Sequence, residues 1–397
     1  MNLFYVTILL FQFINVNTNN NGIVKLSYTN SAGTYFWRVN IGSTNQFHYF
    51  TIDLKHNFNF GTNFKYIKEL SQTIETVSIE KVTIDSTLYS NAVLLQDSIC
   101  LTLTNQTIIH MNEFYFYDLE QTGLFFVDRI SLARFNNENK HFSILHMLHN
   151  KGYIKTLSFA FMPHDDIGNN KETLKNGTLF LGGIPVEYTL NKTKASCKCD
   201  ITKSYWSCLI MKIQIGNKVH YNFENGINLY FRVNKDDFYF PTQIYESIVN
   251  EIFSPLFIKD ICRYEKYTQR TKCSCNNILH NYSFPQVTII LNGMSLVFDN
   301  TDNLFLRYHD ICYFFISPHD NDEFIIGTKI LQEFITEFNI ETNDITFYSD
   351  NHIKIYTHNN TKNYHCKILY CIIYFLLSIF IVYNILILKC IYNKRTY

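Results

Sequence analysis

The sequence predicts a mainly β protein built from two similar halves. Aromatic residues make up 16% of the 397-residue chain, with 35 Phe and 28 Tyr, and aromatic side chains favour strands. From Tyr35 to about Asp350, short runs with β-type patterning alternate with turns that contain Gly, Asn or Asp. A strand-and-turn segment near Asp53 has a counterpart near Arg232, about 180 residues later, which indicates an internal duplication.

The elements follow in order along the chain. Three segments predict helices: Ser143–Asn150, which ends near a glycine, Pro241–Phe253, which begins with a proline, and Ile330–Phe338. The second has apolar residues at a helical spacing. The expected strands include Phe36–Ile41, Phe47–Ile52, Ser78–Ile84, Thr178–Leu181, Leu209–Ile215, Val287–Leu291, Ser295–Phe298 and Asp344–Phe347.

The N-terminus predicts a signal peptide over residues 1–17. Residues 3–14 form an apolar run of signal-peptide length. No basic residue precedes this run, and the Asn-rich segment after it is a poor cleavage site. An uncleaved anchor is therefore the alternative.

The C-terminus predicts a transmembrane helix over Ile368–Leu388. These 21 residues carry no charge, which is enough to span a bilayer, and they are apolar on every face, unlike a buried core helix. Lys389, Lys394 and Arg395 follow, and basic residues favour the cytoplasmic side. We expect a single-pass type I membrane protein with a polar stalk at 351–367 and a cytoplasmic tail at 389–397. Its bulk would lie in the lumen of the secretory pathway or outside the cell.

Cysteines and sequons agree with that topology. Nine of the 11 cysteines lie at or before Cys366, where an oxidising compartment favours disulfides. Zinc is the competing interpretation for the two Cys-x-Cys pairs at 197–199 and 273–275, but zinc sites usually have two to four intervening residues. Five Asn-x-Ser/Thr sequons predict glycosylation at Asn105, Asn176, Asn191, Asn281 and Asn359.

Composition and motifs exclude several function classes. Lys+Arg and Asp+Glu are equal at 34 each, so the chain has no electrostatic footprint for nucleic acid. No phosphate-binding or dinucleotide-binding glycine pattern is present, and we expect no cofactor. His141, His146 and His149 lie near one expected helix. Metal binding would need a further ligand on the same face, so we expect no metal there.

Six segments in order resemble the pepsin-like aspartic protease family. Tyr35–Phe47, YFWRVNIGSTNQF, is similar to the family's opening strand, and Asp53 follows twelve residues after Ile41, where the family has its first Asp-Thr-Gly. The resemblance implies a bilobed fold, with lobes at 35–190 and 204–350 and a connector between them. The other matching segments are Leu148–Phe161, Gly177–Ile184, Tyr205–Gly216, Cys275–Cys312 and Phe324–Phe347.

The two catalytic positions of this family are only half retained. The first loop keeps Asp53, but Leu54 and Lys55 replace the following Thr-Gly. Counting back nine residues from Pro241 places Arg232 where the family has its second catalytic Asp. Further departures are Phe60 for a Trp, Asp85 or Ile84 at the flap Tyr, Arg129, Leu132 and Arg134 for three glycines, and Thr328 for a late Asp.

These departures predict a catalytically inactive member. The family's chemistry needs two carboxylates that share one proton, and Arg stays protonated. The chain resembles a degenerate, membrane-anchored plasmepsin-type protein that would bind a protein or peptide in the interlobe cleft or on its surface. The alternatives are an aspartic endopeptidase with an atypical site built on Asp53, rescued by Asp236 or Asp237, and a surface antigen whose fold serves only display.

Two contacts follow from the resemblance. Cys275 and Cys312 align with a family disulfide, while the pairing of Cys197, Cys199, Cys208, Cys262 and Cys273 stays open. In the family the two catalytic loops meet, so we expect Asp53 and Arg232 to form a salt bridge in place of the catalytic water. The alternative is that Arg232 turns into solvent.

Overall fold

The computed structural model describes residues 22–31, 33–43, 46–62, 70–84, 87–119, 128–135, 139–164, 175–265, 269–276, 278, 282–299, 304–308, 310–350 and 354–357. Within these ranges, no helix is long and apolar enough to cross a membrane. The expected signal peptide at 1–17, the stalk at 351–367 in large part, the span at 368–388 and the tail at 389–397 lie outside them. Asp85, Asn281 and Asn359 do too.

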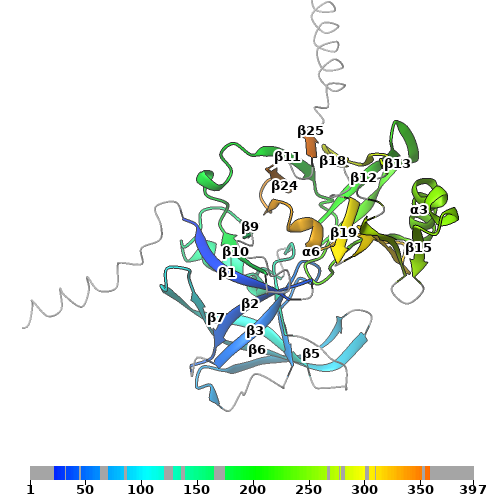
Figure 1. Cartoon of the computed structure of the whole chain (residues 1–397). Helices are drawn as coiled ribbons and strands as arrows, with labels where there is room; N and C mark the ends of the chain where they lie inside the picture. Colours follow the sequence, from blue (N-terminus) through cyan, green and yellow to red (C-terminus); the bar gives the residue numbers. More distant parts are fainter. Residues whose placement is uncertain are drawn as a thin grey trace, which may run out of the picture. The chain divides into compact units, whose positions relative to one another are not determined.

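A sheet of 13 strands includes both halves of the chain, as predicted for a mainly β protein (Figure 1). At one end, β11 from the middle of the sequence and β24 and β23 from its late part continue directly into β9, β10 and β1 from the early part. The strands in sheet order are β11 Thr193–Lys198, β24 Asp344–Ser349, β23 Ile335–Asn339, β9 Ser158–Pro163, β10 Lys175–Leu181, β1 Val24–Ser31, β2 Thr34–Ile41, β3 Gln46–Asp53, β8 Arg129–Ser131, β4 Phe60–Thr62, β7 Ile108–Leu119, β6 Thr87–Thr102 and β5 Glu75–Ile84.

Two smaller sheets lie in the second half. The eight-stranded sheet consists of β21 Ile316–His319, β14 Phe238–Pro241, β22 Phe324–Ile326, β13 Lys218–Phe231, β12 Ser207–Ile215, β17 Val287–Leu291, β18 Met294–Phe298 and β25 Lys354–Thr357. The four-stranded sheet consists of β15 Cys262–Glu265, β16 Arg270–Ser274, β20 Ile311–Phe314 and β19 Phe305–Tyr308.

The duplication predicted from the sequence is present as two four-strand units. In the first, β3 is parallel to β8, β8 is antiparallel to β4, and β4 is parallel to β7. In the second, β13 is parallel to β22, β22 is antiparallel to β14, and β14 is parallel to β21. Asp53 is the last residue of β3, and Arg232 follows the last residue of β13, so the two expected site residues occupy corresponding strand ends.

Two of the three expected helices are confirmed and the third is mostly wrong. Helix α2 covers Ile144–Asn150, and α3 covers Thr242–Ile258 directly after Pro241. The third segment overlaps only the last two residues of the short helix α6, Thr328–Leu331, before β23 begins. Ile335 and Phe338 are buried in β23, which pairs with β9 and β24 on its two edges. A strand buried on both faces lacks the alternation that distinguishes it from a helix.

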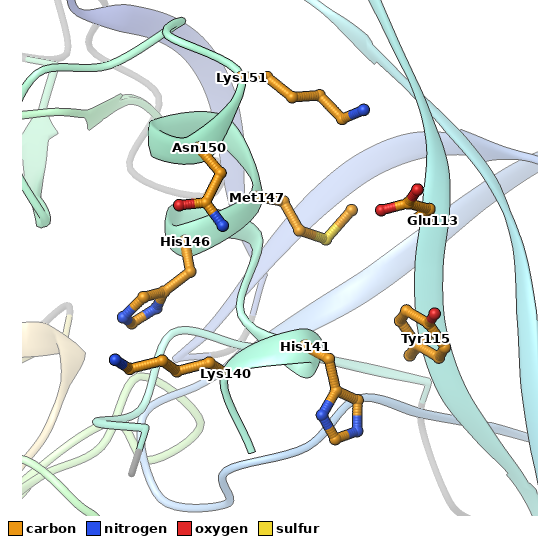
Figure 2. A pocket seen from close by; sticks show the side chains of 8 residues that line it. All are labelled: Glu113, Tyr115, Lys140, His141, His146, Met147, Asn150 and Lys151. Carbon is orange, nitrogen blue, oxygen red and sulfur yellow. The ribbon is translucent and has the colours of Figure 1, made fainter. Parts of the chain in front are cut away.

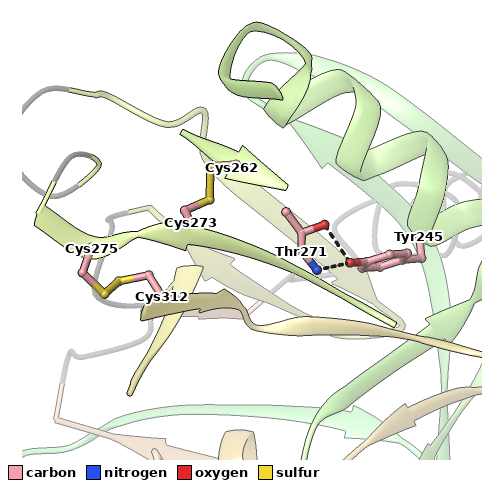
Figure 3. Close-up of a disulfide and its surroundings, with 6 residues drawn as sticks. All are labelled: Tyr245, Cys262, Thr271, Cys273, Cys275 and Cys312. Atoms are coloured by element: carbon pink, nitrogen blue, oxygen red, sulfur yellow. Dashed lines mark hydrogen bonds between the residues drawn. A yellow bond between two sulfur atoms is a disulfide. The ribbon is translucent and has the colours of Figure 1, made fainter. Parts of the chain in front are cut away.

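The disulfide expected from the resemblance is confirmed. Cys275 bonds to Cys312, and Cys262 bonds to Cys273 on the neighbouring strand (Figure 3). The third bond joins Cys197 to Cys208, while Cys199 is a buried thiol. Three of the four cysteines in the two Cys-x-Cys pairs are thus in disulfides, which leaves the zinc interpretation without its ligands.

We expect removal of the Cys275–Cys312 bond to lower the free energy of unfolding by about 2–4 kcal/mol. The bond closes a loop between residues 37 apart, and cross-linking a loop of this length restricts the unfolded chain. Urea unfolding of the Cys275→Ser, Cys312→Ser variant measures the loss. A change below about 1 kcal/mol would show that the bond does not constrain the unfolded state.

Candidate functional site

The corresponding ends of β3 and β13 meet at Trp206. The backbone N–H of Trp206 donates to Leu54 O at 3.5 Å, and Trp206 O accepts from Phe231 N–H at 3.1 Å. Trp206 is fully buried. The loop that follows Asp53 and the end of β13 that precedes Arg232 are therefore linked through the backbone of one residue.

The Asp53 carboxylate is buried and surrounded by donors. Its side chain is 4% exposed. One oxygen accepts from the backbone N–H groups of Lys55 at 2.7 Å and His56 at 3.3 Å. The other lies 2.6 Å from His56 Nδ1 and 3.3 Å from Arg129 Nη1. The hydroxyl of Ser131 donates to the carbonyl of His56 and so holds the histidine in place.

These contacts decide the ionisation of Asp53. Burial alone would raise the pKa of the Asp53 carboxyl. The hydrogen bond and charge of His56, the charge of Arg129 and the amide of Lys55 outweigh it and hold the pKa below its ordinary value of 3.8. Asp53 is therefore an ionised acceptor between two basic side chains.

Arg129 has a role that the sequence did not predict. It begins β8, beside Thr51 of β3, at one of the positions where the family has glycine. Its guanidinium lies over the ring of Phe60, 5.1 Å from the centroid. The sequence shows only that a glycine is lost, whereas the structure shows that the new side chain pairs with Asp53. His56 was missed altogether, although it lies three residues past Asp53.

Arg232 has a different partner, and the expected Asp53–Arg232 salt bridge is wrong. Its Nη2 atom lies 2.9 Å from Glu323 Oε2, and the Arg232 side chain is 15% exposed. Its guanidinium lies 5.8 Å from the centroid of the Tyr230 ring. Asp53 thus pairs with Arg129, and Arg232 pairs with Glu323. Because His56 and Arg129 already satisfy Asp53, its carboxylate does not need the second loop.

The two acids after Arg232 do not rescue the site. Asp237 is fully buried, and its carboxylate contacts Arg270, Lys329 and Ser317. Asp236 accepts from the Tyr239 hydroxyl at 2.6 Å. Both carboxylates therefore serve contacts within the second half of the chain and neither contacts Asp53.

The comparisons with known proteins agree with this geometry. A family model described as eukaryotic aspartyl protease matches residues 67–349. The chain belongs to the eukaryotic aspartyl protease family.

Solved structures of the same fold include two plant basic 7S globulins. Basic 7S globulin from soybean matches with a TM-score of 0.64 and 13% identity, over 82% of this chain and 94% of that one. Conglutin gamma, a basic 7S globulin from lupine seeds, matches with a TM-score of 0.64 and 12% identity, over 83% of this chain and 95% of that one. A comparison with curated protein sequences finds no match. The structural likeness confirms the predicted pepsin-like fold.

An aspartyl protease needs one ionised and one protonated carboxyl at these strand ends. Here the first position holds an ionised acid with four close donors, and the second holds a guanidinium that cannot give up its proton at ordinary pH. The described residues offer no second carboxyl that contacts Asp53. Asp53 pairs with Arg129 and Arg232 pairs with Glu323, so the two positions lack the acid–base pair of an aspartyl protease.

The flap and the glycosylation positions predicted from the sequence fall only partly within the described residues. Strands β5 and β6 form a hairpin in which Ile84 pairs with Thr87, as expected for the flap of an aspartyl protease, but the tip with Asp85 is outside the described residues. Asn105, Asn176 and Asn191 are exposed, so their sequons are accessible, and their glycosylation stays a prediction.

Proposed function

We propose that this chain is a pseudoprotease: a noncatalytic aspartyl protease family member that binds a protein or peptide. The observation that carries the proposal is the closed environment of Asp53. All four of its close contacts are donors or cations, and the second catalytic position is an arginine paired with Glu323. A water activated by two carboxylates has no counterpart in such a site.

The binding role is supported by what the fold keeps. The hairpin β5–β6 and the junction of the two strand ends at Trp206 remain, although the catalytic acids do not. A ligand-binding role needs the strands and the hairpin around the site, but it does not need the catalytic acids. Selection from a displayed random-peptide library tests it, and failure to recover any reproducible binding sequence would contradict it.

We also propose that the protein is anchored in a membrane through residues 368–388, with the family domain on the lumenal or extracellular side. The support is the uncharged 21-residue run and the basic residues after it. A protease-protection assay on intact membranes tests this orientation. Digestion of residues 35–350 from the cytosolic side would refute it.

We expect no aspartic peptidase activity between about pH 3 and 7 and no tight binding of pepstatin, because that inhibitor type places a hydroxyl between two carboxyl groups. A fluorogenic peptide library and a pepstatin titration measure both, with pepsin as the positive control. Cleavage that disappears in the Asp53→Ala variant would overturn the proposal and favour an atypical endopeptidase.

A further inference from the structure

A second candidate site lies away from Asp53, in the first half of the chain. A pocket of about 380 Å³ lies between β7 on one side and α2 with the short 3₁₀ helix η2, Lys140–Phe142, on the other (Figure 2). This volume is at the lower end of the range for small-molecule sites. Its lining combines charged, imidazole and apolar side chains.

The two walls of the pocket are held at a fixed separation by one buried side chain. The amide nitrogen of Asn59 donates to Tyr115 O on β7 at 2.9 Å and to Phe142 O on η2 at 2.8 Å. Asn59 is fully buried, and its amide oxygen accepts from Ser131 N–H at 2.8 Å. Because every polar group of Asn59 is used in this bracing, the pocket is formed before any ligand arrives.

His146 is oriented by its own helix. Its Nδ1 lies 2.9 Å from the hydroxyl of Ser143, which also accepts the backbone N–H of His146 as the N-cap of α2. The side chain is 9% exposed, and within the described part of the chain its other ring nitrogen has no hydrogen-bond partner. When the Ser143 hydroxyl donates to Nδ1, the ring proton lies on Nε2, which then acts as a donor.

The charges around the pocket favour an anion. Two lysines, Lys140 and Lys151, outnumber the single carboxylate of Glu113, and none of the three forms an ion pair within the described residues. Figure 2 shows Lys140 on the same side as His146, with Glu113 and Lys151 across from them. Burial and the charges of Lys140 and His149 lower the pKa of His146, so an anion bound there would favour its protonated form.

The remaining lining supplies apolar contact. Met147 extends into the space between the walls (Figure 2). The ring of Tyr115 meets that of His141 edge to face, with centroids 5.2 Å apart. A flexible thioether beside an aromatic ring suits an apolar body of variable shape.

We propose that this pocket binds a small organic carboxylate, whose charged group contacts Lys140 and His146 and whose apolar body packs on Met147 and Tyr115. Free aromatic acids and the C-terminal residue of a peptide share this chemistry. The proposal does not depend on the pseudoprotease function, because no residue that contacts the Asp53 carboxylate lines the pocket.

The test compares N-acetyl-phenylalanine with its uncharged amide, using calorimetric titration of the full-length protein. We expect the acid to bind and the amide to bind at least about tenfold more weakly. Equal affinity of acid and amide, or no binding of either, would refute the proposal. A titration with phenylacetate distinguishes a free aromatic acid from the C-terminal residue of a peptide as the ligand. Binding as tight as that of N-acetyl-phenylalanine indicates a free acid, and weaker binding indicates a peptide C-terminus.

Two variants locate the site. Lys140→Gln should weaken binding of N-acetyl-phenylalanine about three- to tenfold, whereas Lys212→Gln, at an exposed lysine of β12, should leave it unchanged. Binding to the unaltered protein should strengthen between pH 7.5 and 5.5, and His146→Gln should abolish that dependence. Equal effects of the two lysine variants, or an unaltered pH profile in His146→Gln, would place the ligand elsewhere.

Discussion

Replacing Asp53 with alanine is expected to lower the free energy of unfolding by about 3–5 kcal/mol. In an active aspartyl protease the same substitution removes a catalytic carboxylate and is used to test activity. Here the carboxylate is 4% exposed and lies 3.3 Å from the guanidinium of Arg129. The alanine removes the carboxylate that faces that guanidinium, which is 15% exposed, and it removes the oxygen that accepts from the amides of Lys55 and His56.

Urea unfolding of Asp53→Ala measures this loss, and two controls separate its causes. Asp53→Asn keeps an acceptor for the two amides and removes only the charge, so it should cost less. The double change Asp53→Leu with Arg129→Leu removes both charges and should cost much less than the two single changes added together. A loss below about 1 kcal/mol for Asp53→Ala would mean that the carboxylate is hydrated and the site is open.

The same ion pair predicts a direction for acid stability. The pKa of Asp53 is lowered in the folded state, so its contribution is fully present above the unfolded value near 3.8 and is lost as pH falls through the lower folded value. The difference in stability between the unaltered protein and Asp53→Asn should therefore shrink as pH falls below 4.

The strands that carry this site could be predicted from the sequence, but the ion-pair partners of its residues could not. The motifs put Asp53 and Arg232 at the ends of equivalent strands. In the structure β3 ends at Asp53, and β13 ends one residue before Arg232. Their partners could not be predicted from one sequence. Arg129 is 76 residues from Asp53, and Glu323 is 91 residues from Arg232. Which of several nearby charges closes such a pair depends on side-chain reach in the folded chain, which residue spacing does not reveal.

Secondary structure shows the same division. The strand expected at Leu209–Ile215 lies within β12. This strand could be predicted because its apolar residues alternate with polar ones. β23 was mistaken for a helix, because burial on both sides removes that alternation. The pocket beside α2 had one signal, the cluster of three histidines. The sequence could not show that Asn59, more than 80 residues before His141, braces the wall to which His141 and His146 belong.

The second large effect is expected at Asp237. Its side chain is fully buried and lies between the guanidinium of Arg270 and the ammonium of Lys329, which is 2.7 Å away. The Ser317 hydroxyl donates to the same carboxylate at 2.8 Å. Alanine at this position would leave the two cations with only the more exposed Asp236 carboxylate beside them, and we expect a loss of about 3–5 kcal/mol in the free energy of unfolding.

Asp236 provides the matched control for this prediction. It is the preceding residue, and it lies 3.5 Å from each of the same two cations, but its side chain is 32% exposed. Asp236→Ala should therefore cost only about 1 kcal/mol, mostly through the lost hydrogen bond from Tyr239. Equal losses in the two variants would show that solvent screens both pairs alike. A large loss confined to Asp237 would instead show that this carboxylate is committed to holding the loop after Arg232 against β16 and α6, which is the physical reason it cannot act as the missing second acid.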